Sequence, residues 1–328
     1  MKAVLCKSYG PPENLVVEER PTPQPGPGQV RVGVHACGVN FPDTLIIQGT
    51  YQFKPELPFS PGGEVAGVIQ ALGEGVTGFA IGQRVIAATT WGGYAEEVLA
   101  ETKRLIPMPE AMDFRTAAAF TLTYGTSHHA LKDRAQIKPG ETLLILGAAG
   151  GVGLAAVELG KAMGARVIAA ASSDEKLALC AVHGADATIN YATEDLRARI
   201  KDLTNGRGID VVYDPVGGDL SELALRSMAW NGRFLVVGFA AGRIPSLPLN
   251  LPLLKGCSVV GVFWGAFTRN EPERNAANLQ ELLQWWSQGL LKPHVSAVYP
   301  LERAVEALSD LVQRRVQGKA VLVTGRSA

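Results

Sequence analysis

The sequence predicts an α/β protein in which a doubly wound parallel sheet is joined to a smaller all-β domain. Two observations carry this prediction. Up to about Leu122, short apolar strands are separated by turns rich in Gly and Pro, which is typical of a small barrel or sandwich. From Thr123 onwards, apolar strands alternate with helical patterns, which is typical of a parallel sheet covered by helices.

The strands of the first part are recognised by short apolar runs or by alternation. Val30, Val32 and Val34 fall on one face of the segment 29–36, as in a half-buried strand. Residues 21–28 read PTPQPGPG, a stiff connector rich in turns. The other expected strands are 2–5, 15–18, 62–72, 83–88 and 94–99.

The second part alternates regularly. The expected strands are 142–146, 167–171, 209–214, 234–238 and 258–263, and the helices between them include 174–183, 194–203 and 220–229. Two amphipathic helices follow at 276–288 and 301–313, and then a strand at 320–324. We expect this tail to return to the first domain. The sequence therefore predicts one domain from residues 1–122 with 264–328, and a second from residues 123–263.

A turn of small residues follows the strand 142–146 and opens the next helix. It reads A-x-G-x-x-G, with Ala148 in place of the usual first glycine. Because Gly150 has no side chain, the backbone can approach a pyrophosphate, and Gly153 lets the helix pack closely on the strand. The helix start offers unpaired N–H groups and the positive end of its dipole. Strand, turn, helix and second strand in order predict a dinucleotide site, formed by Ala148, Ala149, Gly150, Gly151, Val152 and Gly153.

The end of the second strand favours NADPH as the nucleotide. NAD sites usually carry an acidic residue here for the ribose 2′-OH, whereas NADP sites make room for a phosphate. This strand is followed by Ser172, Ser173 and Lys176, all of which can donate to a phosphate. The Asp-Glu pair at 174–175 counts against this interpretation, but acids also suit the first turn of a helix.

The composition excludes several classes of protein. Lys and Arg number 31, as do Asp and Glu, and no basic block is present, so we expect no nucleic-acid and no membrane-surface partner. No apolar run has the length of a membrane span, and the first residues lack a signal-peptide core. The four cysteines lie far apart without a C-x-x-C motif, which predicts reduced thiols in a cytoplasmic protein.

Six motifs are spread over nearly the whole chain. They are CGVNFPD at 37–43, PGGEVAG at 61–67, GAAGGVG at 147–153, GAD at 184–186 with Tyr191, YDPVGG at 213–218 and GKAVL at 318–322. Together they resemble the motifs of the zinc-independent quinone oxidoreductases, the zeta-crystallin-like group of the medium-chain dehydrogenase/reductase superfamily. The resemblance implies a GroES-like barrel as catalytic domain, a Rossmann domain, and NADPH held in the cleft between them. It also implies a homodimer joined through the edge strand from Cys257 to Phe263, since an apolar edge invites pairing.

The resemblance also implies roles for residues of the first domain. Asn40 and Asp43 would lie at the substrate end of the cleft, with Tyr51 on a loop over it. Asn40 would donate to a substrate carbonyl oxygen as negative charge develops there. Asp43 would orient that donor or a water, or else be a solvated or structural carboxylate. Tyr51 would stack on a flat acceptor or supply a proton, or else be a surface aromatic.

Further cofactor contacts follow from the same resemblance. Thr126 would lie beside the nicotinamide amide, unless it is an ordinary threonine inside a helix. Lys176 and Tyr191 would hold the adenosine 2′-phosphate. The residues that end the strand 234–238 reach the carboxyl edge of the sheet, where dinucleotides bind. The ribose or nicotinamide contacts expected there are Gly238, Phe239 and Ala240.

The sequence predicts no metal site. Zinc alcohol dehydrogenases of the superfamily have Cys at the position of Asn40 and G-H-E where Gly62, Gly63 and Glu64 stand. A catalytic zinc needs three protein ligands, and two of them are replaced here. Cys37 is close in sequence, but a small buried thiol is its expected role. Without a strong Lewis acid, hydride transfer to an electron-poor acceptor is favoured over alcohol oxidation.

The sequence therefore predicts an NADPH-dependent oxidoreductase that passes a hydride to a quinone or an activated enone without zinc, most of the rate coming from placement. Two alternatives remain open. One is an enoyl- or acryloyl-CoA reductase of the same fold, which needs cations for the CoA phosphates; Arg243, Arg269 and Arg274 are candidates. The other is a non-catalytic NADPH-binding structural or sensor protein, because a fold alone does not establish an activity.

Overall fold

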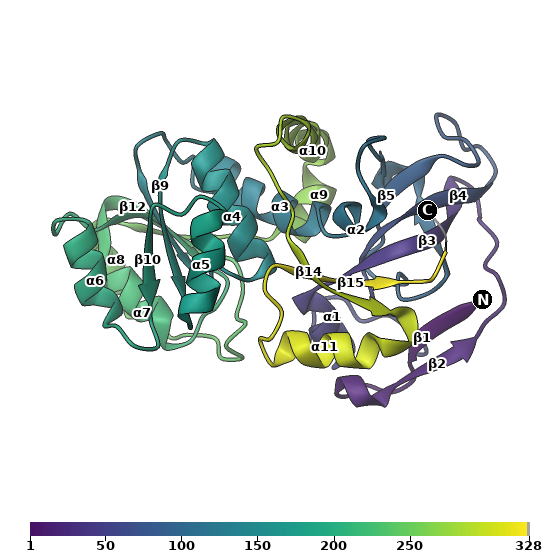
Figure 1. Cartoon of the computed structure of the whole chain (residues 1–328), viewed down its shortest axis with the longest axis horizontal. Helices are drawn as coiled ribbons and strands as arrows, with labels where there is room; N and C mark the ends of the chain where they lie inside the picture. The colour runs from purple at the N-terminus through teal and green to yellow at the C-terminus, as the bar shows by residue number, and fades with distance from the viewer. Residues whose placement is uncertain (327–328) are drawn as a thin grey trace. The chain divides into compact units, whose positions relative to one another are not determined.

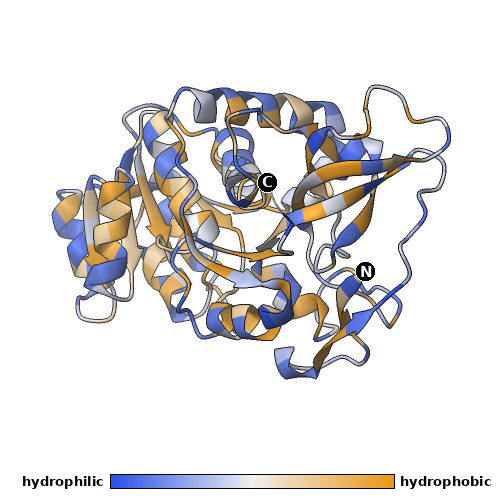
Figure 2. Cartoon of the chain, turned by 45° about the vertical axis from the view of Figure 1, so that its right-hand side comes forward, coloured by the Kyte–Doolittle hydropathy of each residue, from blue (hydrophilic) through white to orange (hydrophobic). Residues whose placement is uncertain are grey.

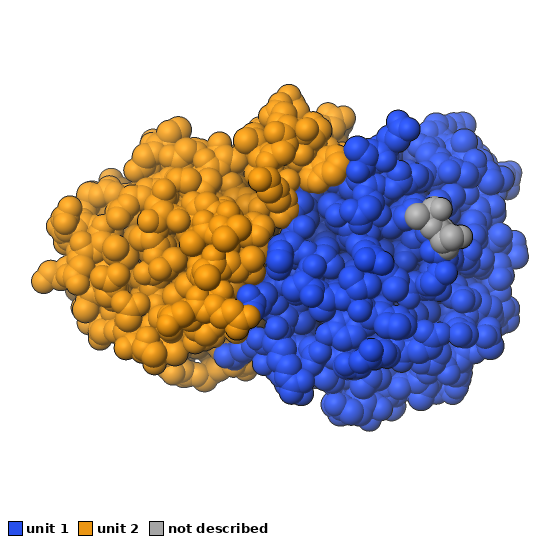
Figure 3. Space-filling view, viewed as in Figure 1, with its two compact units in different colours: residues 1–122, 293–328 blue, residues 123–292 orange. Residues whose placement is uncertain are grey.

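The computed structural model describes residues 1–326, and the chain divides into two compact units (Figure 3). Unit 1 combines Met1–Leu122 with the chain from Pro293 onwards, and unit 2 is Thr123–Lys292. The chain passes from unit 1 to unit 2 after Leu122, which is where the sequence predicts this boundary. It passes back to unit 1 at Pro293, whereas the sequence predicts that boundary at residue 264.

Unit 2 is built on a six-stranded sheet in which all neighbouring strands are parallel. In chain order the strands are β8 (Thr142–Leu146), β9 (Arg166–Ala171), β10 (Ala187–Asn190), β11 (Ile209–Asp214), β12 (Met228–Val236) and β13 (Ser258–Gly261). Their order across the sheet is β10-β9-β8-β11-β12-β13. This is the arrangement of the doubly wound dinucleotide-binding fold, in which the strand order reverses beside the first strand. The predicted fold class is confirmed.

Helices connect these strands (Figure 1). They are α4 (Gly151–Ala162), α5 (Asp174–Val182), α6 (Leu196–Leu203), α7 (Asp219–Arg226) and α8 (Asn250–Lys255). The helices carry both hydrophilic and hydrophobic bands in Figure 2, as expected for helices with one face on a sheet. The helix predicted at 220–229 ends at Arg226, because Met228 already begins β12 and pairs with Ile209.

Two helices beyond the sheet also belong to unit 2. They are α9 (Trp264–Asn270) and α10 (Pro272–Ser287). Earlier in the chain, unit 2 also contains α3 (Thr121–His128), apart from its first two residues, and the π-helix His129–Arg134. The ring of His129 stacks on Phe267 with centroids 3.9 Å apart, and Asn278 Nδ2 donates to Asp133 Oδ2 at 2.8 Å. These long-range contacts hold 264–292 on unit 2, which the periodicity of the sequence does not reveal.

Unit 1 contains a small antiparallel pair and a larger mixed sheet. The pair is β1 (Lys2–Cys6) and β2 (Leu15–Glu19). The seven-stranded sheet comprises β3 (Gln29–Val39), β4 (Glu64–Leu72), β5 (Arg84–Ala88), β6 (Glu97–Glu101), β7 (Leu105–Pro107), β14 (Val295–Pro300) and β15 (Lys319–Val323). Its helices are α1 (Phe41–Ile46), α2 (Phe114–Ala117) and α11 (Ala304–Val312), with short 3-10 turns at Pro12–Asn14, Thr102–Arg104 and Leu301–Arg303.

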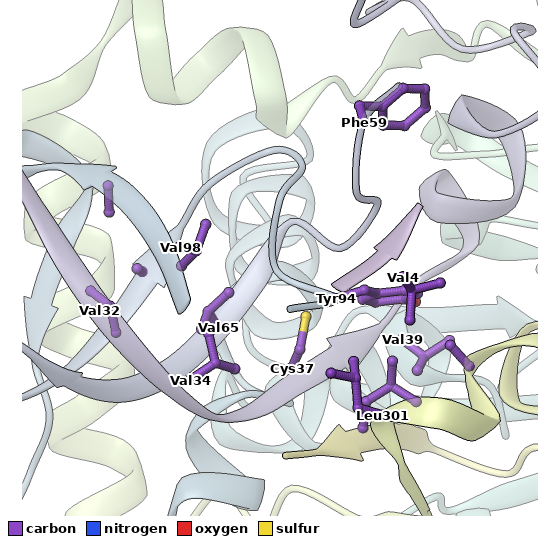
Figure 4. Packing of buried hydrophobic residues seen from close by; sticks show 14 of the residues in the cluster. Val4, Val32, Val34, Cys37, Val39, Phe59, Val65, Tyr94, Val98 and Leu301 are labelled. Atoms are coloured by element: carbon purple, nitrogen blue, oxygen red, sulfur yellow. The ribbon is translucent and has the colours of Figure 1, made fainter. Parts of the chain in front are cut away.

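The strand β3 is the centre of unit 1. It pairs with β4, β6 and β15, so it joins the N-terminal and C-terminal parts of the unit. Val30, Val32 and Val34 are fully buried, which confirms the predicted face of this strand. Figure 4 shows Cys37 and Tyr94 among the apolar side chains of the same core. The carboxyl end of β3 leads directly into α1, with Asn40 at the junction and Asp43 in the first turn of the helix.

None of the helices within residues 1–326 combines the length and the apolar character that crossing a bilayer requires.

Candidate functional site

The predicted nucleotide turn in unit 2 joins β8 to α4. Gly147 has a φ of 59°, a left-handed conformation that favours glycine, and Ala148 and Ala149 are buried behind it. Gly150 is the N-cap of α4 and, having no side chain, makes no capping hydrogen bond to the first turn. By contrast, Ser173 caps α5 and Asp195 caps α6 through side-chain oxygens. The N–H groups at the start of α4 are therefore not capped by the N-cap residue, which is the arrangement found where helices bind anions.

The glycines of the turn serve different purposes. A Cβ on Gly153 would lie 2.4 Å from the carbonyl oxygen of Gly147, so Gly153 is needed for close packing of α4 on the turn. A Cβ on Gly150 would meet nothing closer than 3.4 Å. The backbone of Gly150 is extended, with φ −79° and ψ 170°. Gly150 thus leaves open space at the helix start, as a site for a pyrophosphate requires.

The loops after β11 and β12 lie beside this turn at the carboxyl edge of the sheet. Val216, after β11, is the residue that a Cβ on Gly147 would meet, at 2.7 Å. Ala240 N donates to Pro215 O at 3.0 Å, which fixes the loop after β12 on the loop after β11. This places Gly238, Phe239 and Ala240, the predicted ribose or nicotinamide contacts, at the edge where the strand order reverses.

The helix α3 is attached to the same turn. Ser127 Oγ donates to Val152 O and shares a hydrogen bond with the hydroxyl of Tyr213, both at 2.8 Å. Its neighbour Thr126 is half-buried on α3. Ser127 and Tyr213 anchor α3 at the nucleotide turn, a role that the sequence motifs do not reveal.

The end of β9 carries hydroxyl and ammonium groups. Lys176 Nζ donates to Ser172 Oγ at 3.3 Å, and Ser173 Oγ accepts from Lys176 N at 3.4 Å. Tyr191 is tied to the same strand end, because its backbone N–H donates to Ala171 O at 3.1 Å. The structure thus brings Ser172, Lys176 and Tyr191 to one edge of the sheet.

The neighbouring acid at position 174 has a structural partner. Asn190 Nδ2 donates to Asp174 Oδ1 at 2.8 Å, which links the start of α5 to the end of β10. This contact agrees with the interpretation of Asp174 as an acid of a helix first turn. The group of donors at Ser172, Ser173 and Lys176 therefore matches a phosphate better than a ribose diol.

Unit 1 contains a buried polar network around Asn40, at the junction of β3 and α1. Asn40 Oδ1 accepts from Lys319 Nζ at 2.6 Å. Its Nδ2 donates to Glu64 Oε2 at 3.1 Å and to Gly38 O at 3.3 Å. Asn40 is 4 % exposed. The Asn40 Nδ2 group thus already makes two hydrogen bonds within the unit. It can donate to a substrate oxygen only if one of these bonds is broken.

Glu64 accepts hydrogen bonds at both oxygens. Oε1 accepts from Thr121 Oγ1 at 3.0 Å and from Leu122 N at 2.8 Å, while Oε2 faces Asn40 and Lys319. All these partners are donors, which is the pattern that a carboxylate requires. Glu64 therefore connects the start of β4 to the chain that leaves unit 1.

Asp43 is the second buried acid of the network. Its Oδ2 accepts from Asn40 N at 2.8 Å and from Tyr94 OH at 3.0 Å. Burial raises the pKa of Asp43 to about 6, although these hydrogen bonds and Lys319 act in the opposite direction. Asp43 is thus a buried carboxyl with structural partners, and it can also exchange a proton near neutral pH.

Cys37 and Tyr51 complete the set of candidates in unit 1. Cys37 is 1 % exposed, and burial raises the pKa of its thiol well above the ordinary value, so it is the inert buried thiol that the sequence predicts. Tyr51 lies on the loop after α1, half-buried, with its ring edge-to-face on Phe53 at 5.7 Å. Its proposed stacking role stays a prediction.

Two residues of this network have no role assigned from the sequence. Lys319 stands in the GKAVL motif and Glu64 in the PGGEVAG motif, but only the fold brings them to Asn40. The sequence does offer one signal for Lys319, a lysine that begins an apolar strand. A lysine before a buried strand is common on protein surfaces, so that signal has little specificity.

Comparisons with known proteins agree with this architecture. The family described as "Alcohol dehydrogenase GroES-like domain" matches residues 26–110, and the family described as "Zinc-binding dehydrogenase" matches residues 151–284. The chain is 42 % identical to the quinone oxidoreductase-like protein 2 homolog of Nematostella vectensis, over 98 % of this chain and 89 % of the relative.

Solved structures give the same result. The quinone oxidoreductase of Pseudomonas syringae is 35 % identical, with a TM-score of 0.92 over 98 % of this chain and 99 % of that one. The Escherichia coli quinone oxidoreductase, solved in complex with NADPH, is 31 % identical, with a TM-score of 0.92 over 98 % and 100 %. The fold and these relatives define an oxidoreductase built from a GroES-like unit and a dinucleotide-binding unit. The chain belongs to the quinone oxidoreductase group of the medium-chain dehydrogenase/reductase superfamily.

One family description mentions zinc, but the side chains around Asn40 do not fit this metal. Within residues 1–326, no three His, Cys, Asp or Glu side chains are arranged to hold a metal ion. A Cβ on Gly63 would lie 3.0 Å from Thr90 O, so a histidine there needs the backbone to move. The ammonium of Lys319 already occupies Asn40 Oδ1 and would repel a cation.

Proposed function

We propose that the protein is an NADPH-dependent reductase that transfers a hydride to a quinone or an activated enone without zinc. The observation that carries this proposal is the arrangement of two features at one edge of the sheet. The start of α4, which follows β8, has no side-chain cap, and Lys176 with two serines lies at the end of the neighbouring strand β9. The NADPH complex of the Escherichia coli relative and the names of the relatives support it.

We assign the cofactor to unit 2. The turn Ala148–Gly153 would receive the pyrophosphate, and Lys176 with Ser172 would bind the 2′-phosphate. Thr126 and the residues 238–240 would contact the nicotinamide end. When bound, NADPH supplies the hydride, and the chain's own groups only have to bind and orient the reactants.

We assign the acceptor to the polar residues of unit 1. The Asn40 amide would donate to the acceptor oxygen as negative charge develops there. Its hydrogen bond to Gly38 O is 3.3 Å long, at the weak end of the range, and is the bond that the acceptor oxygen would replace. A proton is needed to complete the reduction, and we assign it to Asp43, which accepts from the Asn40 backbone N–H and whose pKa is raised to about 6 by burial.

A thioester of coenzyme A is less well supported as the acceptor. Two of the three arginines considered for its phosphates have acidic partners, because Arg243 pairs with Asp219 and Arg274 pairs with Asp133 at 2.7 Å. The structure thus gives this alternative no separate support.

The test follows the absorbance of NADPH with the purified protein and a benzoquinone, an α,β-unsaturated ketone or acryloyl-CoA. We expect turnover with the quinone or the ketone, and no loss of activity when the protein is treated with a chelator. A preference for the thioester, or an activity that requires a stoichiometric zinc, would contradict the proposal. Tight NADPH binding without turnover of any acceptor would instead identify a sensor or structural protein.

We also propose a homodimer formed through the edge strand β13. β13 is the last strand of its sheet, and Val259 and Phe263 are 44 % and 43 % exposed. An exposed apolar edge is a template for pairing with a second copy. Light scattering at micromolar concentration should give a mass twice that of one chain. A Val259→Asp variant should be monomeric, and a monomeric wild type would exclude the dimer.

A further inference from the structure

Lys319 begins β15 and carries a buried positive charge. Its side chain is 6 % exposed, which is rare for lysine unless its donors are matched. Three acceptors surround Nζ: Val39 O at 2.9 Å, Asn40 Oδ1 at 2.6 Å and Glu64 Oε2 at 3.5 Å. An ammonium has three N–H donors, so each of them finds a partner.

The amide of Asn40 lies between two opposite charges. Its oxygen faces the ammonium of Lys319, and its NH2 group faces the carboxylate of Glu64. Turning the amide by half a turn would set the NH2 group against the ammonium and the oxygen against the carboxylate. Both contacts are repulsive, and burial strengthens them. The orientation of the Asn40 amide therefore depends on the charge of Lys319.

We propose that Lys319 is a positioning residue for the reaction, because its ammonium holds the Asn40 amide in the orientation that donates to the acceptor oxygen. The inference rests on the proposed function, since it requires Asn40 to contact the substrate. Lys319 acts through Asn40 and does not itself touch the acceptor. Neutralising Lys319 should therefore slow the reaction without weakening NADPH binding, which unit 2 provides.

The same ammonium influences the second acid of the network. The ionisable groups that face Asp43 are Cys37 from β3, Glu64 from β4, Tyr94 from the loop before β6 and Lys319 from β15. Of these, Lys319 is the only one that carries a positive charge, and it favours the ionised carboxylate of Asp43. Asp43 donates its proton in the proposed reaction, so activity falls as the pH rises through the pKa of Asp43. Loss of Lys319 should therefore shift this alkaline limb of the activity profile to higher pH. A purely structural role of Lys319 would not move it.

The experiment compares Lys319→Met and Lys319→Arg with the wild type. The dissociation constant for NADPH reports the integrity of unit 2, and kcat and KM for a benzoquinone are measured from acid to neutral pH. We expect the Met variant to lose roughly 10- to 100-fold in kcat, which is less than the roughly 100- to 1000-fold typical for removal of an oxyanion-hole donor, because the Asn40 donor itself remains. Its NADPH affinity should be unchanged, and the Arg variant should recover most of the loss. A matched control is Lys2→Met, because Lys2 is an exposed lysine of unit 1 that pairs with Glu302.

A second variant covers the case in which Lys319→Met does not fold. Lys319→Met combined with Glu64→Gln removes both charges, so no buried charge is left unpaired. This double variant should bind NADPH and show the same loss of kcat. A wild-type kcat in Lys319→Met or in the double variant would overturn the positioning role of Lys319 but not the proposed function. Equal losses of kcat in Lys319→Met and Lys319→Arg, with an unchanged pH profile, would do the same. A wild type that binds NADPH but reduces no acceptor would remove the proposed function, and the inference with it.

Discussion

The Nζ atom of Lys319 lies 2.6 Å from Oδ1 of Asn40, although 279 residues separate the two in sequence. The antiparallel pairing of β15 with β3 explains this contact, since Ala320 is opposite Val39 in the ladder. Lys319, the first residue of β15, thus places its positive charge at the end of β3. Glu64, opposite in charge, reaches the same point from β4.

Removing this charge should destabilise unit 1. Lys319→Met leaves Glu64 buried without its cation, and breaking a buried ion pair from one side typically costs about 3–5 kcal/mol. Urea unfolding of the variant should show a loss of this size. The double variant Lys319→Met with Glu64→Gln should lose much less, because both charges are gone. If the single and the double variants are equally unstable, the ion pair is not the cause.

Gly38 should tolerate no side chain. A Cβ at this position would lie 2.1 Å from Ala118 O and 2.7 Å from Glu64 Oε2. Gly38→Ala must therefore shift the backbone at Ala118 as well as the Glu64 carboxylate, and we expect a loss of at least roughly 1–3 kcal/mol, as for other overpacked cores. Gly261→Ala, measured at a concentration at which the protein is monomeric, is the matched control in a strand, since nothing within the same chain lies within 4 Å of its Cβ. Thermal unfolding should leave the control near the wild type.

The fold could be predicted from the sequence where local signals decide it. The turn at 147–153 and the apolar strands of unit 2 follow from periodicity and glycine placement, and β9 and β11 lie where the sequence predicts them. The sequence did not reveal that α9 and α10 pack on unit 2. Their contacts, such as the stacking of Phe267 on His129, join segments that are far apart in the chain.

The candidate site shows the same division. The grouping of Lys176 with the serines before it could be predicted because all three lie on one strand-to-helix turn, and their contact with a phosphate stays a prediction. The partners of Asn40 could not, because Glu64 and Lys319 reach it from two other strands. A pairing of strands across most of the chain length leaves no local pattern in the sequence. Only the register of β3 with β4 and β15 brings these charges together.

Asp43 should make the stability of unit 1 depend on pH. Burial raises its pKa from 3.8 to about 6 in the folded protein. Because the folded pKa is the higher one, folding favours the protonated carboxyl. This contribution is complete below about pH 4 and is lost as the pH rises through about 6, by roughly 3 kcal/mol.

The matched control for this prediction is Asp43→Asn, which keeps an acceptor for Asn40 N and Tyr94 OH but cannot titrate. The free energy of unfolding of the wild type, relative to the variant, should fall between about pH 4 and pH 6. Urea unfolding at several pH values measures this difference. A constant difference across the range would show that Asp43 does not titrate there.

Lys176 should determine the preference for NADPH over NADH. Its Nζ lies beside Ser172 at the end of β9, where we place the 2′-phosphate. A hydrogen bond to a charged group contributes about 1.5–3 kcal/mol, so Lys176→Ala should lower the preference about 10- to 100-fold. Lys201→Ala is the control, since Lys201 is an exposed lysine in the last turn of α6. Dissociation constants for both nucleotides decide the matter, and an unchanged ratio would contradict the assignment.

Gly150 and Gly153 should respond differently to the same substitution. Gly150 has a backbone conformation that alanine adopts without strain, and its Cβ would meet nothing closer than 3.4 Å. Gly150→Ala should therefore fold with wild-type stability but bind NADPH at least about 10-fold more weakly, because the methyl group fills the space for the pyrophosphate. Gly153→Ala should instead lose stability, since its Cβ would lie 2.4 Å from Gly147 O. Thermal unfolding without nucleotide and titration with NADPH separate the two effects. A Gly150→Ala protein that binds NADPH like the wild type would show that the pyrophosphate does not lie at the start of α4.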